Sequence, residues 1–159
     1  MLIAVSKKVL SMLMSRAGRL AVMALVELSE QELHEWMNAE ELAQRIGSAL
    51  PSLKQVLNRL KRAGLVRARP GRSGGYQLAH GPRKMSSSIV GQAMDGRAPR
   101  LQCFLDSTSC DGSKDCRASR TWHPMREALL IFLETDTIQT VAARSRRLAD
   151  RFKLSDLDA

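Results

Sequence analysis

The sequence lacks a hydrophobic run long enough to cross a membrane. A transmembrane helix needs roughly 20 apolar residues, and no stretch of this 159-residue chain approaches that length. The apolar stretches Val9–Met14 and Leu20–Leu28 are interrupted by Arg16 and Arg19, and no convincing small-residue cleavage site follows them. We therefore expect a cytoplasmic protein whose first apolar segment is a core helix with a short N-terminal extension.

Acidic residues are missing from a long central part of the chain. No Asp or Glu occurs between Glu41 and Asp95, whereas ten Lys and Arg residues fall between Arg45 and Lys84. Residues 1–100 hold 16 Lys/Arg and 7 Asp/Glu, so they account for the whole net charge of +9. A solvated protein face normally mixes both signs. The one-signed region therefore predicts a nucleic-acid surface, the alternative being solubilising charge on a protein-binding domain.

Cysteine is scarce, and the chain has only three. An odd number in a chain large enough to form its own core argues against a secreted disulfide framework. The spacing of Cys103, Cys110 and Cys116 is too wide for the CxxC knuckle of a zinc ribbon. Thiolates are soft ligands that suit iron–sulfur clusters, zinc or copper(I). The spacing favours a cluster and leaves zinc, redox-sensing thiols and inert cysteines open.

What the chain does contain is dominated by helical patterns. Dense apolar positions predict a largely buried helix over residues 15–32. Asn38, with Glu41 three residues later, predicts a capping box at the start of a second helix. That helix is expected to stop at Gly47, because glycine favours the backbone conformation that ends helices.

A third helix follows after a very short turn. Pro51 suits its first position, because the missing N–H would have no partner there, and Gly64 is expected just after its end. Apolar residues at helical spacing predict one buried stripe, which consists of Leu53, Val56, Leu57 and Leu60. Polar side chains that can bind base edges or phosphates occupy the other face, namely Ser52, Lys54, Gln55, Asn58, Arg59 and Arg62.

Two short extended runs come next. Residues 65–69 and 76–78 flank a turn rich in glycine and proline, which predicts a β-hairpin. Two helices joined by a tight turn and followed by a hairpin form the order of a winged helix-turn-helix, whose second helix enters the major groove. Arginines on the hairpin, or wing, are placed to reach phosphates or the minor groove, namely Arg67, Arg69 and Arg72.

Helical patterns resume after the hairpin. Ser86–Ser88 predict the cap of a short fourth helix, and a long helix with an apolar stripe starts at about Ser119. Asp136 or Thr137 is expected to cap a final helix that runs to about Arg151. The stripe on the long helix exceeds what one small winged domain can cover, so we expect it to build a homodimer.

The predicted fold is mainly α with a small β-hairpin wing, that is, a winged helix-turn-helix plus a long C-terminal dimerisation helix. The expected parts are an N-terminal extension (1–12), the DNA-binding domain (13–97), a cysteine-bearing loop (98–118), the dimerisation and C-terminal helices (119–151) and a tail (152–159).

Several stretches carry a resemblance to a known family, and they cover about residues 13–142. They are Gly18-Arg19-Leu20-Ala21-Val22, Leu57–Val66, Gly71-Arg72-Ser73-Gly74-Gly75-Tyr76, Trp122, and Phe132-Leu133-Glu134 leading into Thr137-Ile138. Together with the three clustered cysteines, they resemble the iron–sulfur cluster regulator (IscR) family, which includes the nitric-oxide sensor NsrR and the iron regulator RirA.

The resemblance implies a homodimeric transcription regulator, expected to be a repressor, that binds double-stranded DNA at an inverted repeat. It also implies that the protein is not an enzyme. It further implies an iron–sulfur cluster, 2Fe–2S or 4Fe–4S, held by Cys103, Cys110 and Cys116, whose state sets operator affinity. Iron–sulfur status, redox stress and nitric oxide are all possible stimuli. A zinc-bound or thiol-oxidised winged-helix regulator is the alternative, and a small electron-transfer protein would have no need of a basic recognition helix.

The chain departs from the family pattern in the DNA-binding part. The family wing usually has Arg-Gly where this chain has Pro70-Gly71, so Arg69 or Arg72 takes over that arginine's role. Ser52 replaces a common aromatic, and Lys54 stands where some members have an acid that tunes DNA choice. The operator sequence of other members is therefore not carried over.

The fourth cluster ligand also departs from the pattern. Members that use histidine place it where this chain has Ser119. His123 lies one helical turn further on a similar face and is the candidate, with Asp111, Asp115, Ser119 or a small external ligand as alternatives. An acidic ligand that some relatives take from the first helix would fall at Arg19, which closes that option.

Overall fold

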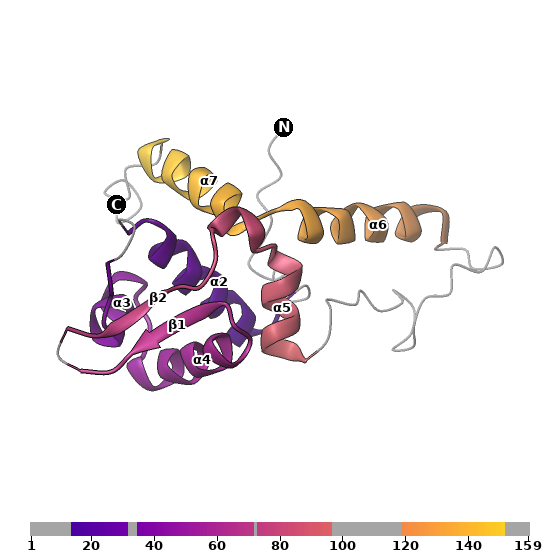
Figure 1. The fold of residues 1–159 in the computed structure, drawn as a ribbon. Coiled ribbons are helices and arrows are strands. Elements are labelled where there is room, and N and C mark those ends of the chain that lie inside the picture. Colours follow the sequence, from indigo (N-terminus) through magenta and orange to yellow (C-terminus); the bar gives the residue numbers. More distant parts are fainter. Residues whose placement is uncertain (1–13, 32–34, 72, 97–118, 152–159) are drawn as a thin grey trace.

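Helices and one short hairpin make up the part of the chain that the structure, a computed structural model, describes. It covers residues 14–31, 35–71, 73–96 and 119–151. Figure 1 shows the hairpin, helices α2 to α5 and α7 gathered in one body, whereas α6 begins away from this body and runs toward it, ending where α7 starts. None of the helices in these ranges is long and apolar enough to cross a bilayer.

Helix α2, Arg16–Ser29, runs through the centre of the core. It begins within one residue of the predicted 15–32 segment, because the hydroxyl of Ser15 accepts a hydrogen bond from the backbone N–H of Gly18 at 3.0 Å. Its inward face combines small and branched side chains, which lets neighbouring helices approach closely. The buried members are Gly18, Ala21, Ala24, Leu25 and Leu28.

Helix α3, Ala39–Arg45, begins where the capping pattern predicts. The side-chain oxygen of Asn38 accepts a hydrogen bond from the backbone N–H of Glu41 at 2.8 Å, which satisfies one of the free donors at the helix start. Gly47 follows the helix with a positive φ of 63°, a conformation that glycine adopts without a steric cost. The expected start and stop of this helix are confirmed.

Helix α4, Leu50–Arg62, starts one residue earlier than predicted. Ala49 is its N-cap and offers no side-chain bond, so Pro51 occupies the second position rather than the first. The second position suits proline as well, because the first four N–H groups of a helix lack intrahelical acceptors. The predicted stripe is confirmed as core, since Leu53, Val56, Leu57 and Leu60 are each at most 4% exposed.

The wing consists of β1, Val66–Arg69, and β2, Gly75–Leu78, paired antiparallel. It is tied to the segment before α3, because Met37 and Tyr76 exchange two backbone hydrogen bonds of 3.1 and 2.8 Å. Gly75 makes this approach possible, since a Cβ there would lie 2.3 Å from the Met37 carbonyl oxygen. The hairpin is therefore fixed to the body at its β2 strand.

Helix α5, Ser87–Asp95, follows a single 3-10 turn, η1, at Pro82–Lys84. Ser86 caps the helix as predicted, with its hydroxyl accepting from the backbone N–H of Ile89 at 3.3 Å. The left-handed Gly96, with φ 70°, ends it.

The C-terminal part consists of α6, Ser119–Thr135, and α7, Ile138–Arg151. Of the two predicted caps for α7, Thr137 is the one used, because its hydroxyl accepts a backbone hydrogen bond from the first turn at 3.3 Å. Asp136 is instead buried, and its carboxylate pairs with Arg144 at 2.8 Å. Helix α7 packs back against α2, so the C-terminal helix belongs to the same body as the wing.

Candidate nucleic-acid interface

The outer face of α4 gathers most of the predicted DNA contacts. Because the leucine and valine stripe faces the core, the remaining positions lie at the surface. Hydroxyl, amide and guanidinium groups on this face can donate or accept hydrogen bonds at base edges. The exposed residues of this face are Ser52, Lys54, Gln55, Asn58, Arg59 and Arg62.

Lys54 has an acidic partner that the sequence pattern hid. Its Nζ lies 3.1 Å from Oε1 of Glu40, which is located in the first turn of α3. A backbone hydrogen bond at Glu40 and, after it, the Lys54 ammonium hold the pKa of Glu40 below its ordinary value of 4.5. Glu40 is therefore ionised at neutral pH, and its carboxylate pairs with the Lys54 ammonium. The acid-free stretch after Glu41 does not reveal this partner, because the fold of α3 brings an earlier acid beside α4.

Arg59 contacts the protein itself rather than projecting freely from α4. Its Nη1 donates a hydrogen bond to the Met94 carbonyl oxygen at 2.9 Å. That carbonyl belongs to the last turn of α5, where carbonyl groups lack intrahelical donors and favour a cation. The exposed position that the helical pattern assigns to Arg59 thus includes a bond to a second helix, 35 residues away in sequence.

On the wing, Arg69 is held by an aromatic ring. Its guanidinium carbon lies 4.8 Å from the centroid of the Trp36 ring, within the range of cation–π attraction. Arg69 also donates a hydrogen bond to the backbone oxygen of Ser73, across the turn. Trp36 was not among the residues predicted from the sequence, although an aromatic residue close before the Asn38 cap was the available signal. Arg72 lies outside the described residues.

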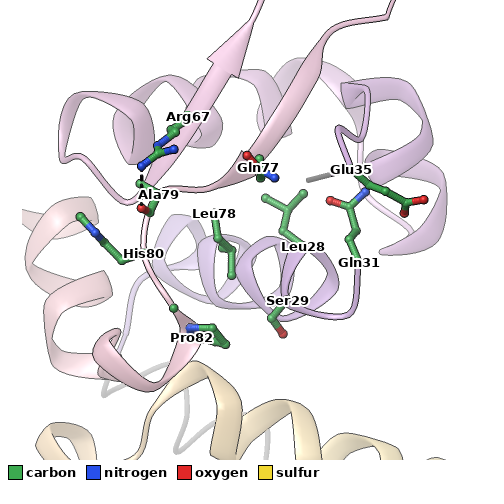
Figure 2. Close-up of a pocket in the computed structure, with 11 residues that line it drawn as sticks. Leu28, Ser29, Gln31, Glu35, Arg67, Gln77, Leu78, Ala79, His80 and Pro82 are labelled. Atoms are coloured by element: carbon green, nitrogen blue, oxygen red, sulfur yellow. Dashed lines mark hydrogen bonds between the residues drawn. The ribbon is translucent and has the colours of Figure 1, made fainter. Parts of the chain in front are cut away.

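Arg67 lines a hollow of about 390 Å³ beside the hairpin (Figure 2). Its cross-strand partner Gln77 lines the same hollow, while Leu28 and Leu78 supply apolar walls from α2 and β2. The guanidinium donates a long hydrogen bond of 3.4 Å to the Ala79 carbonyl oxygen. Arg67 is exposed, and a bond at this length is weak, so the side chain can be drawn to a phosphate at little cost.

The predicted cluster ligands fall mostly outside the described residues. Cys103, Cys110 and Cys116 all lie there, as do the alternative ligands Asp111 and Asp115. In the ranges that the structure describes, no three His, Cys, Asp or Glu side chains come together in a way that could hold a metal ion.

His123 is described, and it is exposed in the N-terminal half of α6. Its Nε2 lies 3.8 Å from Oε2 of Glu127, one helical turn further along. This distance is at the outer limit of an ion-pair contact, so the contact with Glu127 holds the imidazole only weakly. Ser119, one of the alternative ligands predicted from the sequence, is the first residue of the same helix.

Similarity to known proteins identifies the family of the chain that carries this interface. The chain matches, over residues 14–144, the model of the Rrf2 family, described as iron-dependent transcriptional regulators. The chain belongs to the Rrf2 family. Among curated relatives, an rrf2-like HTH-type transcriptional regulator of Rhodobacter capsulatus is 31% identical, over 77% of this chain and 87% of that protein. The transcriptional regulator IscR of Photobacterium profundum is 27% identical, over 80% and 73% respectively.

Solved structures agree with the fold of this Rrf2 chain. CymR, the global cysteine regulator of B. subtilis, aligns with a TM-score of 0.68 at 21% identity, covering 82% of this chain and 96% of CymR. IscR of T. potens aligns with a TM-score of 0.62 at 22% identity, covering 82% and 86%. The predicted winged helix-turn-helix is therefore confirmed, and this Rrf2 chain is a DNA-binding transcriptional regulator rather than an enzyme.

Proposed function

We propose that this Rrf2-family regulator is a cytoplasmic repressor that binds an inverted-repeat operator as a homodimer and responds to iron–sulfur status, redox stress or nitric oxide. The exposed polar face of α4, set against a fully buried stripe, is the observation that carries the DNA-binding part. Ser52, Gln55 and Asn58 are assigned to base edges. The cationic residues assigned to phosphates are Lys54, Arg62, Arg67, Arg69 and Arg72.

The homodimer is proposed to form through α6. Large apolar side chains remain exposed along it: Met125 is 49% exposed, Ile131 55% and Phe132 44%. Soluble proteins cover such a row, and a second copy of the same helix covers it symmetrically. Because α6 extends away from the winged body (Figure 1), pairing along it leaves both α4 helices free to bind DNA.

The sensing element is proposed to be an iron–sulfur cluster held by Cys103, Cys110 and Cys116. Three thiolates form a donor set that fits such a cluster, and the family's description as iron-dependent supports it. The exposed imidazole of His123 is the proposed fourth ligand, since among the described residues its ion-pair contact, with Glu127, is a long one of 3.8 Å. When bound, the cluster supplies a group that reacts with oxidants and nitric oxide, and the chain's own residues convert its presence into a change of operator affinity.

The test is anaerobic purification of the full chain, followed by absorbance spectroscopy and analysis for iron, sulfide and zinc. Visible sulfur-to-iron charge transfer with matching iron and sulfide supports the cluster. Colourless, zinc-loaded protein overturns it in favour of a zinc-stabilised regulator, and colourless metal-free protein whose DNA binding follows thiol oxidation favours a thiol sensor. Selection of bound sequences from random DNA then tests for an inverted repeat.

Variants assign the ligands in the same experiment. Cys103→Ala, Cys110→Ala and Cys116→Ala are each expected to give colourless protein that remains dimeric and has the operator affinity of the stripped wild type. His123→Ala is expected to weaken the cluster less. His80→Ala serves as its control, since His80 is also exposed but lies beside the hairpin. Full cluster retention in all three cysteine variants would refute cluster sensing.

A further inference from the structure

Helix α5 is fixed at its N-terminal end to the junction between α6 and α7. The backbone N–H of Ser87 donates to the Asp136 carbonyl oxygen at 3.0 Å, and Ile138 donates to the Met85 carbonyl oxygen at 2.8 Å. The Ser87 hydroxyl adds a third bond to the same Asp136 oxygen at 3.3 Å. Ser87, Asp136 and Ile138 are all buried, so these bonds are shielded from water. The start of α5 is therefore expected to move together with the C-terminal end of α6.

The C-terminal end of α5 is fixed to α4 by Arg59. The 2.9 Å bond from its guanidinium to the Met94 carbonyl oxygen joins a cation to the negative end of a helix. Hydrogen bonds with a charged partner are stronger than neutral ones. Met94 itself is 4% exposed and Val90 is fully buried, so the helix that carries this carbonyl is anchored in the core.

Between these two ends, α5 is packed into the hydrophobic core. Val90 and Met94 belong to the same hydrophobic core as the α4 stripe, and close-packed cores transmit displacement rather than absorb it. In Figure 1, α5 lies between the end of α4 and the junction of α6 with α7. Helix α5 thus connects α4, the proposed recognition helix, to the C-terminal end of α6.

From this geometry we propose that Arg59 is a positioning residue that sets the orientation of α4 relative to α5 and, through α5, relative to α6. This inference rests on the proposed function, in which α6 pairs two copies and α4 enters the major groove. In such a dimer the separation of the two recognition helices determines which half-site spacing the protein accepts. Arg59 acts on spacing selectivity through Met94, and base identity is determined by Ser52, Gln55 and Asn58.

The experiment compares Arg59→Met with Arg62→Met in the full chain. Both variants remove one cation from the last turn and a half of α4, but only Arg59 is bonded to α5. Each protein is titrated against the selected operator, against operators with one base pair inserted or deleted between half-sites, and against single-base variants. Thermal unfolding checks that each protein is folded, and Arg59→Gln, which adds no apolar surface, serves as a second variant.

We expect the ratio of affinities for the correctly and wrongly spaced operators to fall about tenfold in Arg59→Met and Arg59→Gln. The order of preference among single-base operator variants is expected to stay that of the wild type. Arg62→Met is expected to lower affinity for all operators by a similar factor and to keep spacing discrimination. Wild-type spacing discrimination in both Arg59 variants, or a loss of preference at one base pair, would overturn the inference and make Arg59 a base contact. A wild type without specific binding to any inverted repeat would overturn the proposed function itself.

Discussion

Removal of the Phe132 side chain from α6 is expected to weaken the dimer strongly. Phe132 is 44% exposed in the single chain, and an aromatic side chain presents about 200 Å². The area left for a partner is therefore about 90 Å², worth about 2 kcal/mol at roughly 25 cal/mol per Å². Each dimer contains two copies, so Phe132→Ala costs about 4 kcal/mol, or about a thousandfold in the dimer dissociation constant.

Sedimentation equilibrium over a range of concentrations measures this constant directly. Phe132→Asp is expected to go further and give monomers, because a carboxylate in the interface has no partner. Glu134→Ala is the matched control, since Glu134 is exposed on the same helix and contributes no apolar area. A Phe132→Asp protein that dimerises as tightly as the wild type, or a wild type that is monomeric where it binds DNA specifically, refutes the role of α6.

Three further predictions concern the interface and the wing. If a dimer contacts about six phosphates, operator affinity is expected to fall about a thousandfold between roughly 50 and 200 mM salt, and a flat dependence in fluorescence anisotropy contradicts the electrostatic argument. Gly75→Ala, whose Cβ would lie 2.3 Å from the Met37 oxygen, is expected to lower the free energy of unfolding by about 2–3 kcal/mol in urea titrations, whereas Gly81→Ala, with open space around it, is expected to change it little. Because the folded-state pKa of Glu40 lies below 4.5, its pairing with Lys54 stabilises the fold above that pH, and this stabilisation is lost as the pH falls through the lowered value. The Glu40→Gln protein is therefore expected to lose less stability on acidification than the wild type and to bind random DNA more tightly at neutral pH. Equal curves of unfolding free energy against pH for both proteins contradict the pairing.

The sequence determined the elements whose causes are local. Asn38 and Ser86 cap helices through bonds to residues three positions further along, and such spacing is visible in the chain itself. The stripe of α4 follows from the helical period alone, and Gly64 after it marks the stop. The family was also within reach of the sequence, because its wing and cysteine motifs are contiguous stretches.

Only the tertiary structure decided which charged groups of the interface are already engaged. Lys54 meets Glu40 across 14 residues, and Arg59 meets Met94 across 35. Nothing in the period of α4 separates Arg59 from its neighbour Asn58, since both are exposed. The difference arises because α5 ends beside one of them, and the position of α5 depends on core packing and on its bonds to the α6–α7 junction. Long-range pairs of this kind depend on how elements close upon one another, which local spacing does not encode.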